Sequence, residues 1–254
     1  MIIKDYSVSQ EEFTLVYDSL LELYRTNPVP DELGKYYESE AYISHTDSRK
    51  TLFDRLYQWV KSYNLKHKIA LIKQYKKENI HLLDIGAGTG DFVLSSKKYA
   101  HWEAMGIEPS EKARAKAEEK GLLLQADFSE LLPHSFDVIT MWHVLEHVPD
   151  VAQEIQIISN LLKENGIAVI AVPNYRSWDA QHYKEHWAAY DVPRHLWHFS
   201  KKSIEQLFAK EGFQLLATHP MFFDAFYVSM LSEQYKTGKK SFLKGFLNGL
   251  RSNY

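Results

Sequence analysis

A glycine-rich turn that follows an acid is the segment of this sequence best suited to chemistry. Residues 81–85 have a strand-like pattern that carries Asp84 toward the end of the strand, and Gly86, Gly88 and Gly90 follow. Glycine lets the backbone turn tightly and lets a ligand approach the N–H groups of the turn. A carboxylate beside those groups suits a zwitterionic amino-acid moiety better than a bare pyrophosphate. The alternative is a strand–helix turn without a ligand.

The spacing of the glycines separates this turn from two phosphate-binding motifs. The dinucleotide fingerprint is G-x-G-x-x-G, whereas this chain has G-x-G-x-G followed by Asp91. A P-loop needs Gly-Lys-Ser/Thr after its glycines, and that tripeptide does not follow here. The spacing therefore favours a ligand other than a diphosphate. A nicotinamide-dependent oxidoreductase built on the same kind of sheet is a competing hypothesis.

Two more acids follow at the ends of the next two strand-like runs. Glu108 lies 22 residues after Gly86, where an acid accepts hydrogen bonds from two ribose hydroxyls. Asp127 closes the following run, where it is placed to accept from an adenine amino group, and Phe128 is placed to pack on the adenine ring. The alternatives are an acid at a helix N-terminus for Glu108 and an ordinary turn acid for Asp127.

The elements that must position these acids alternate along the chain. We expect the strands at 81–85, 103–108, 122–125, 136–142, 167–172 and 213–218. We expect the intervening helices at 91–100, 110–120, 151–163 and 201–211. Strands separated by helices of this length indicate βαβ units and a parallel sheet, with ligands at the carboxyl ends of the strands. The predicted fold class is therefore α/β, a Rossmann-like sheet flanked by helices over residues 79–218.

The flanking regions lack this alternation. Residues 1–78 are predicted to form a helical cap, because Ser9 and Glu12 match a capping box and a second helical pattern begins at Leu52. The lysines of the second pattern are expected on a solvated face. Residues 219–254 are predicted to form two short amphipathic helices.

Composition excludes several function classes. The chain has 254 residues, a formal net charge of −3 and no cysteine. The absence of cysteine excludes disulfides, thiolate metal sites and a cysteine nucleophile. The charge argues against binding of nucleic acid by bulk electrostatics. No apolar run approaches the roughly 18 residues of a membrane span, and no signal peptide is evident, so a cytoplasmic location is expected.

Three motifs together resemble a known family. LLDIGAGTG, GIEPS and ADF are similar to motifs of the class I S-adenosylmethionine-dependent methyltransferases, and the resemblance covers residues 79–218. It implies S-adenosylmethionine as cofactor and a sheet of strand order 3-2-1-4-5-7-6. The cofactor-binding residues that it implies are Asp84, Gly86, Ala87, Gly88, Gly90, Glu108, Pro109, Asp127, Phe128 and His143. The last antiparallel strand of the family is not visible before the chain ends.

Residues 136–150 resemble the small-molecule branch of that family, which includes the ubiquinone- and menaquinone-pathway methyltransferases. The N-P-P-Y/F tetrapeptide of amino-group nucleic-acid methyltransferases is absent at this strand end. A small-molecule acceptor is therefore expected, and aromatic and lipophilic compounds are among the candidates. Methylation of RNA or protein, and cofactor binding without turnover, are the alternatives. The sequence decides neither the acceptor atom nor the oligomeric state.

An aromatic-rich segment, 174–200, is predicted to form a lid over the acceptor, partly helical at 177–188. Loops of this length are usually functional or disordered, and a disordered loop would not carry so many rings. It resembles a family segment with Asp191, Pro193, His195 and Leu196 before a Phe-Ser helix start. The substrate-binding candidates are Tyr175, Trp178 and Tyr190 from this lid, with Tyr36, Tyr42 and His45 from the N-terminal region.

Methyl transfer mainly requires positioning and desolvation of the reactants. An oxygen or nitrogen acceptor also needs a base to remove its proton. His143, His147 and His195 are the candidates. Each has a structural alternative: lining the cofactor, capping a helix, or holding the lid by hydrogen bonds. Glu146, His147 and Asp150 also have a spacing that could hold a divalent ion, although no metal is assigned.

Overall fold

The computed structural model describes residues 1–37, 52–77, 79–239 and 242–252, and it describes no side chains at 52–57 and 242–243. The chain forms two compact units. The first, here called the α/β unit, consists of Asp47–Leu145 and Asp150–Ala171. The second, here called the mixed unit, consists of Met1–Thr46, Glu146–Pro149 and Val172–Tyr254. The mixed unit thus joins the N-terminal region to the predicted lid and the C-terminal helices.

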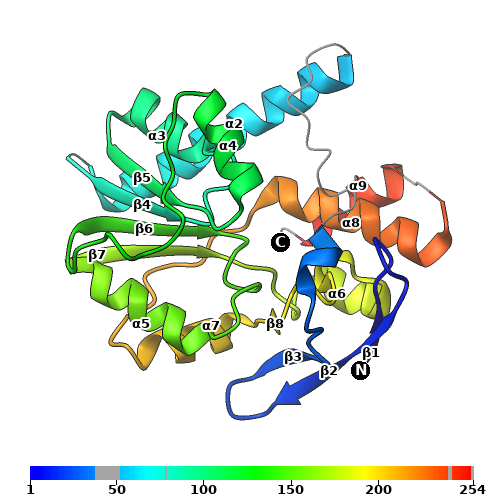
Figure 1. Cartoon of the computed structure of the whole chain (residues 1–254). Coiled ribbons are helices and arrows are strands. Elements are labelled where there is room, and N and C mark those ends of the chain that lie inside the picture. Colours follow the sequence, from blue (N-terminus) through cyan, green and yellow to red (C-terminus); the bar gives the residue numbers. More distant parts are fainter. Residues whose placement is uncertain (38–51, 78, 240–241, 253–254) are drawn as a thin grey trace. The chain divides into compact units, whose positions relative to one another are not determined.

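A parallel sheet of order β5-β4-β6-β7 is the centre of the α/β unit (Figure 1). Its strands are β4 (His81–Ile85), β5 (Glu103–Ile107), β6 (Phe136–Trp142) and β7 (Leu162–Ala171). The register sets Asp84 of β4 between Gly106 of β5 and Thr140 of β6. The neighbours agree with the 2-1-4-5 part of the strand order that the resemblance implied.

Helices cover both faces of this sheet. On one face lie α2 (Leu52–Tyr75), α3 (Asp91–Ala100) and α4 (Glu111–Glu119), and on the other lies α5 (Val151–Leu161) (Figure 1). The first face has a core of apolar side chains from the helices and the strands, among them Ile72, Leu82, Val93, Ala117 and Val138. Burial of this apolar surface is the main driving force for the α/β unit.

Two predicted strands of the sheet are wrong. At 122–125 the chain forms only an isolated bridge, from Gln125 to Ile107, with backbone hydrogen bonds to Gly106 and Glu108. At 213–218 there is no strand, and Leu215 and Leu216 are exposed. A run of β-forming residues becomes a strand only where a partner edge is available.

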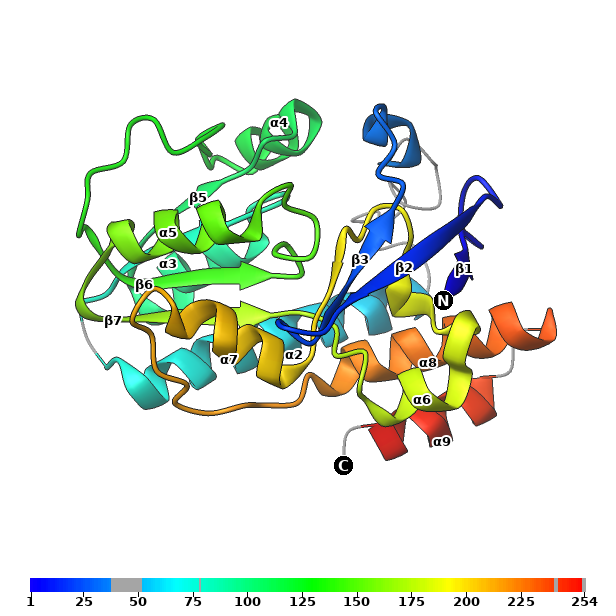
Figure 2. The same cartoon turned by 90° about the horizontal axis from the view of Figure 1, so that it is seen from below.

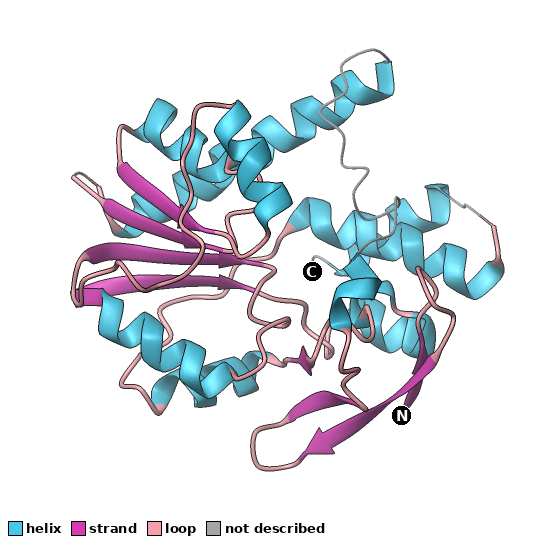
Figure 3. Cartoon of the chain, in the orientation of Figure 1, coloured by secondary structure: helices cyan, strands magenta, loops and turns pink. Residues whose placement is uncertain are grey.

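The mixed unit contains an antiparallel sheet of order β1-β2-β3-β8, visible as the second group of strands in Figure 3. Its strands are β1 (Ile2–Lys4), β2 (Glu12–Asp18), β3 (Leu23–Asn27) and β8 (Trp197–His198). The predicted helix that starts at Ser9 is therefore wrong. Phe13 and Leu15 are buried while Glu12, Thr14 and Val16 are exposed, which is the period of a strand.

Short helices complete the mixed unit. They are η1 (Leu33–Tyr37), α6 (Trp178–Tyr183), η2 (Lys184–His186), η3 (Ala188–Tyr190), α7 (Lys201–Ala209), α8 (Phe222–Thr237) and α9 (Phe242–Ser252). The helix at 52, the two C-terminal helices and the partly helical character of 177–188 are confirmed; the last region contains α6 and the 3-10 helix η2. Helices α6, α8 and α9 pack together (Figure 2). Of the helices that the structure describes, none is long and apolar enough to cross a bilayer.

Candidate functional site

The glycine turn connects β4 to α3 in a left-handed backbone conformation. Gly86, Gly88 and Gly90 have φ angles of 71°, 55° and 75°, which other L residues rarely adopt. A Cβ at Gly86 would lie 2.3 Å from a methyl of Val144, and one at Gly90 would lie 2.3 Å from Leu122. A Cβ at Gly88 would meet nothing within 4 Å. Two glycines are thus required by protein packing, whereas Gly88 faces open space.

Asp84 is buried at the end of β4, and its Oδ1 accepts a 2.6 Å hydrogen bond from Thr140 Oγ1 of β6. Burial raises the pKa of Asp84 to about 7, while the hydrogen bond from Thr140 and the charge of Lys68 act in the opposite direction. Asp84 therefore changes its charge near neutral pH, and a cation bound beside it would favour the ionised form.

Glu108 follows β5 and holds the turn through its carboxylate. Its Oε2 accepts from Gly88 N at 2.8 Å, and its Oε1 accepts from Ser110 N at 2.8 Å. Arg114 Nη1 donates to the carbonyl oxygens of Glu108 and Pro109, each at 2.7 Å. Each carboxylate oxygen keeps a second lone pair, so the group can still accept hydrogen bonds from a ligand.

The remaining predicted cofactor residues lie at neighbouring loops of the α/β unit. Asp127 is exposed and its Oδ1 accepts from Ser129 N at 2.8 Å, and Phe128 is half-buried. His143 is exposed after β6, with φ of 59° and its backbone N–H bonded to Ala171 O. Ala87 N–H bonds to Ile107 O and joins the turn to β5.

Lys120, at the end of α4, contacts the glycine turn, a role that was not predicted from the sequence. Its Nζ donates to Thr89 O at 3.2 Å, to Thr89 Oγ1 at 2.9 Å and to Asp91 Oδ1 at 3.0 Å. Lys61 Nζ lies 2.9 Å from the other oxygen of Asp91. These lysines fix the start of α3. A lysine at the end of the next helix carries no local pattern that could have revealed this role.

The mixed unit brings together Glu146, His147 and His195, whose ligand-type atoms all lie within 4.8 Å of one another. Glu146 is fully buried, and His195 Nε2 lies 4.0 Å from Glu146 Oε1 and 3.9 Å from Asp191 Oδ2. The two imidazole rings contact each other edge to face at 4.6 Å. Asp150 is outside this group: its side chain caps α5 by accepting from Ala152 N and Gln153 N. The predicted Glu146, His147 and Asp150 grouping is therefore wrong in its third member.

Backbone carbonyls orient both histidine rings of this cluster. His147 Nδ1 lies 2.9 Å from Arg194 O, and His195 Nδ1 lies 2.9 Å from Ala189 O. A ring nitrogen that donates to a carbonyl leaves the other nitrogen as the acceptor. Burial, with the charge of His195 second, lowers the pKa of His147 to about 4. The Glu146 carboxylate beside two oriented imidazoles can accept and hold a proton. Two histidines with a carboxylate are also a known donor set for divalent metal ions.

Arg194 connects this cluster to the N-terminal segment, and the sequence analysis did not identify it. It is 1% exposed and binds Asp191 through two nitrogens, Tyr36 O at 3.1 Å, and Ser7 Oγ. Asp5 Oδ1 lies 3.7 Å from Arg194 Nη2. Burial acts to raise the pKa of Asp5, but hydrogen bonds from Ser9 and Ser7 and the charge of Arg194 hold the pKa below its ordinary value.

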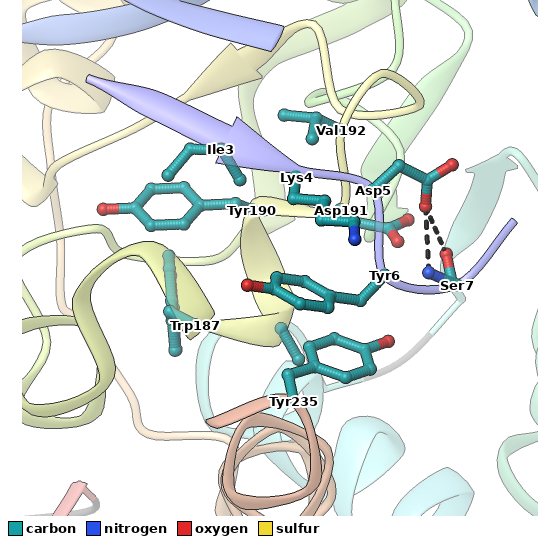
Figure 4. A pocket seen from close by; sticks show the side chains of 11 residues that line it. Ile3, Lys4, Asp5, Tyr6, Ser7, Trp187, Tyr190, Asp191, Val192 and Tyr235 are labelled. Carbon is teal, nitrogen blue, oxygen red and sulfur yellow. Dashed lines mark hydrogen bonds between the residues drawn. The ribbon is translucent and has the colours of Figure 1, made fainter. Parts of the chain in front are cut away.

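A cavity of about 10 Å³ lies against the same segment, lined by residues of β1, the following turn, the lid and α8 (Figure 4). Tyr6 and Tyr235 stack at its edge with ring centroids 4.8 Å apart. Such a volume holds one water molecule. This cavity is therefore too small for a nucleoside or an aromatic methyl acceptor.

The predicted substrate-binding aromatic residues have different environments within the mixed unit. Tyr36 and Tyr190 are buried in its core, whereas Trp178 is 37% exposed at the start of α6. Tyr175 is half-buried and its hydroxyl donates to Glu22 O at 3.1 Å. Tyr42 and His45 lie outside the described residues. The rings of Tyr36 and Tyr190 thus stabilise the unit, and a role for them toward a substrate stays a prediction.

Comparison with known proteins identifies relatives of this chain. Residues 55–218 match a family described as "Methyltransferase domain". A ubiquinone biosynthesis O-methyltransferase of Aeromonas salmonicida is 35% identical over 102 residues, 37% of this chain and 43% of the relative. The same enzyme of Neisseria meningitidis serogroup C is 30% identical over 104 residues, 37% of this chain and 44% of the relative. The matched part thus spans less than half of each relative.

Solved structures share the fold. Phosphoethanolamine N-methyltransferase 2 of Haemonchus contortus, in complex with phosphomonomethylethanolamine and S-adenosylhomocysteine, has a TM-score of 0.55 at 17% identity. The likeness covers 74% of this chain and 50% of that one. The same protein in complex with S-adenosyl-L-methionine gives a TM-score of 0.53 at 19% identity, over 70% of this chain and 44% of that one. At these identities the likeness concerns the fold alone.

Proposed function

This chain belongs to the methyltransferase-domain family, and we propose on that basis that it is an S-adenosylmethionine-dependent methyltransferase acting on a small molecule. The relatives named ubiquinone biosynthesis O-methyltransferases support a hydroxyl group as the methyl acceptor. They do not favour an RNA or protein substrate. A nicotinamide-dependent oxidoreductase is likewise not favoured, because the glycine spacing and the family differ from those of dinucleotide enzymes.

The open face of Gly88 is the observation that supports this proposal most directly. The Gly88 N–H donates to Glu108, and a Cβ added at Gly88 would meet no atom of the described part of the chain within 4 Å. The positive φ by itself favours glycine here, as it does at Gly121. What distinguishes Gly88 is its position in the turn that follows Asp84 and that Glu108 holds, where the open space lets a ligand approach the backbone closely.

The residues around the turn fit S-adenosylmethionine in charge and in hydrogen bonding. Asp84 offers a carboxylate whose ionised form suits the ammonium group of an amino acid. Glu108 retains lone pairs for ribose hydroxyls, and Asp127 is exposed to accept from an adenine amino group. When bound, the cofactor supplies an electrophilic methyl group on a sulfonium, so the protein needs to orient the acceptor and exclude water.

We assign proton acceptance from the acceptor hydroxyl to His195. Its Nδ1 donates to Ala189 O, so Nε2 is the nitrogen that takes a proton, and Glu146 and Asp191 stabilise the imidazolium that results. His147 is the weaker candidate because burial lowers its pKa to about 4. His143 is assigned to the cofactor side of the reaction, as an exposed residue directly after β6.

Two glycine variants test the cofactor site. We expect Gly88→Ala to cost about 1–2 kcal/mol of stability from its left-handed backbone and to weaken S-adenosylhomocysteine binding roughly tenfold or more. Gly121→Ala is the matched control, because Gly121 also has a positive φ, of 78°, with nothing within 4 Å. It should lose similar stability and keep its affinity. Isothermal titration calorimetry and thermal unfolding measure both quantities.

Failure of the wild-type chain to bind S-adenosylhomocysteine at millimolar concentration would overturn the proposal. Equal affinity for S-adenosylhomocysteine in the Gly88→Ala variant and the wild type would show that the ligand does not bind at this turn. The assignment of His195 is tested separately with labelled cofactor and catechol as the probe acceptor. His195→Gln should lower kcat strongly while cofactor affinity stays unchanged, and His147→Gln should have the smaller effect on kcat.

A further inference from the structure

Helix α9 is oriented opposite to an ordinary surface helix. A helix at the surface of a protein normally buries its apolar stripe and exposes its polar residues. Among the described side chains of α9, Gly245, Asn248, Gly249 and Ser252 are buried or half-buried. The exposed residues are Phe246, Leu247 and Leu250, together with Lys244 and Arg251. Phe246, Leu247 and Leu250 therefore leave much of their apolar surface uncovered by the described chain.

The inward face is fixed by close contacts and specific hydrogen bonds. A Cβ at Gly245 would lie 2.7 Å from Met230 Cα, and one at Gly249 would lie 2.5 Å from Phe226 Cδ1. Asn248 Nδ2 donates to Tyr183 Oη at 2.8 Å, and Ser252 Oγ donates to Asp179 Oδ1 at 2.7 Å. These contacts leave α9 no freedom to turn its apolar face inward.

The outward face presents Phe246, Leu247 and Leu250, which are 51%, 50% and 39% exposed. These positions lie within one stripe of the helix, since they are separated by one, three and four residues. Phe246 also stacks on Phe226 of α8, with centroids 4.9 Å apart, which extends the apolar surface onto α8. A contiguous exposed patch of this kind indicates an interaction surface.

The segment that carries the patch is rich in basic residues. Residues 236–254 contain Lys236, Lys239, Lys240, Lys244 and Arg251, and they contain no acid. The Lys244 side chain is 72% exposed, and its Nζ lies 4.0 Å from Oε1 of Glu233 of α8, which is itself buried. Arg251 lies 5.6 Å from the ring of Trp178, which is an amphipathic side chain at the edge of the patch.

We propose that the outward face of α9 binds the surface of an anionic lipid bilayer. Phe246, Leu247 and Leu250 would enter the boundary between head groups and acyl chains, while Lys244 and Arg251 contact the anionic head groups. A second copy of the chain is disfavoured as the occupant, because a two-fold contact would bring these bases against themselves. The proposal is independent of the cofactor site and of methyl transfer.

Vesicle binding by the full chain tests the proposal. We expect co-sedimentation with vesicles of phosphatidylcholine and phosphatidylglycerol, little with phosphatidylcholine alone, and release when the salt concentration is raised. The double variant Leu247→Ser/Leu250→Ser should bind roughly tenfold or more weakly, and Lys244→Gln about fivefold more weakly. Leu132→Ser is the matched control, because Leu132 is a leucine of the α/β unit that is 72% exposed. It should bind as the wild type does.

Three outcomes would overturn the proposal. The first is the absence of binding to the anionic vesicles, and the second is binding that the double leucine variant leaves unchanged. The third is a wild-type dimer that this variant converts to monomer, because the face would then belong to a second copy. Thermal unfolding and S-adenosylhomocysteine affinity should be the same in all variants, which separates loss of lipid binding from loss of the fold or of the cofactor site.

Discussion

The two units of this chain build their candidate sites in different ways. In the α/β unit the site is a backbone turn between consecutive elements, β4 and α3, supported by one acid from the next strand. In the mixed unit the site is a cluster of side chains from segments far apart in the sequence, such as Arg194 and Ser7, which are 187 residues apart. The first depends on local conformation, and the second depends on the pairing of distant segments.

This difference has a physical consequence. A turn that is fixed by left-handed glycines and a parallel register keeps its geometry wherever the sheet forms. A cluster of buried charges keeps its geometry only while every partner is present, because an unpaired buried charge is costly. We therefore expect the α/β unit to tolerate substitutions of polar side chains better than the mixed unit does.

Removal of Arg194 should have the largest effect. Arg194→Met leaves Asp191 and Asp5 without their buried cation, so we expect a loss of about 3–5 kcal/mol of stability, confined to the mixed unit. Hydrogen exchange resolved by segment measures where the loss occurs. Arg176→Met is the control, because Arg176 pairs with Glu22 at the surface and should cost within about 1 kcal/mol. An equal loss of protection in β4 and β6 would contradict the comparison.

Asp84→Asn should instead stabilise the α/β unit at neutral and higher pH. The folded-state pKa of Asp84, about 7, is above its ordinary value of 3.8. Burying the ionised carboxylate therefore costs no stability below about pH 4, where the group is protonated, and destabilises the fold as the pH rises through 7. The gain from asparagine should grow over that range to at most roughly 4 kcal/mol, measured by denaturant unfolding. Affinity for S-adenosylhomocysteine should fall in the same variant.

Asp137→Asn serves as the control of opposite sign. Asp137 lies near the other end of β6, where burial acts to raise its pKa but Lys163 and the backbone N–H of His81 lower it below the ordinary value. The asparagine variant should therefore lose stability above about pH 4, by up to about 1 kcal/mol. A gain of stability in both variants would show that the effect of Asp84→Asn on stability is not electrostatic.

Acid should destabilise the mixed unit through its buried histidines. Burial lowers the pKa of His147 from 6.5 to about 4 and lowers that of His198 well below 6.5, so both are neutral in the folded state. The unfolded chain takes up these protons first, so stability is lost as the pH falls from about 6.5 toward 4. For His147 we expect roughly 2–3 kcal/mol, seen as loss of amide protection in the mixed unit. Protection that is constant over this range would contradict the prediction.

Asp150 should give the smallest effect and decides between a cap and a metal ligand. As an N-cap of α5, Asp150→Ala should cost about 1 kcal/mol, while Asp150→Asn should change stability by only a few tenths. Thermal unfolding of the two variants, with and without added Mg²⁺, measures the difference. If Asp150→Asn lost as much stability as Asp150→Ala only when Mg²⁺ is present, Asp150 would be a metal ligand as well as a cap.

The strands of the two units differ in the same way in how well their sequences predict them. The positions of β4, β5, β6 and β7 along the chain were predicted correctly from their apolar runs, whereas their order in the sheet was what the family resemblance implied. The N-terminal strands were predicted as a helix, because Phe13, Val16 and Leu20 happen to have helical spacing. Their exposure decides otherwise: Val16 and Leu20 are 47% and 86% exposed, whereas Phe13 is buried.

The sequence alone determined the turn with its three glycines and the acids at the ends of β4 and β5, because backbone conformation and the position of a strand along the chain are properties of local segments. Only the tertiary structure decided that His195 joins Glu146 and His147, that Arg194 binds Asp5 and Asp191, and that α9 exposes its apolar face. Those arrangements depend on pairing such as that of β3 with β8, whose members are separated by most of the chain. No local period records such a contact, because its energy comes from burial and charge that exist only after the segments meet.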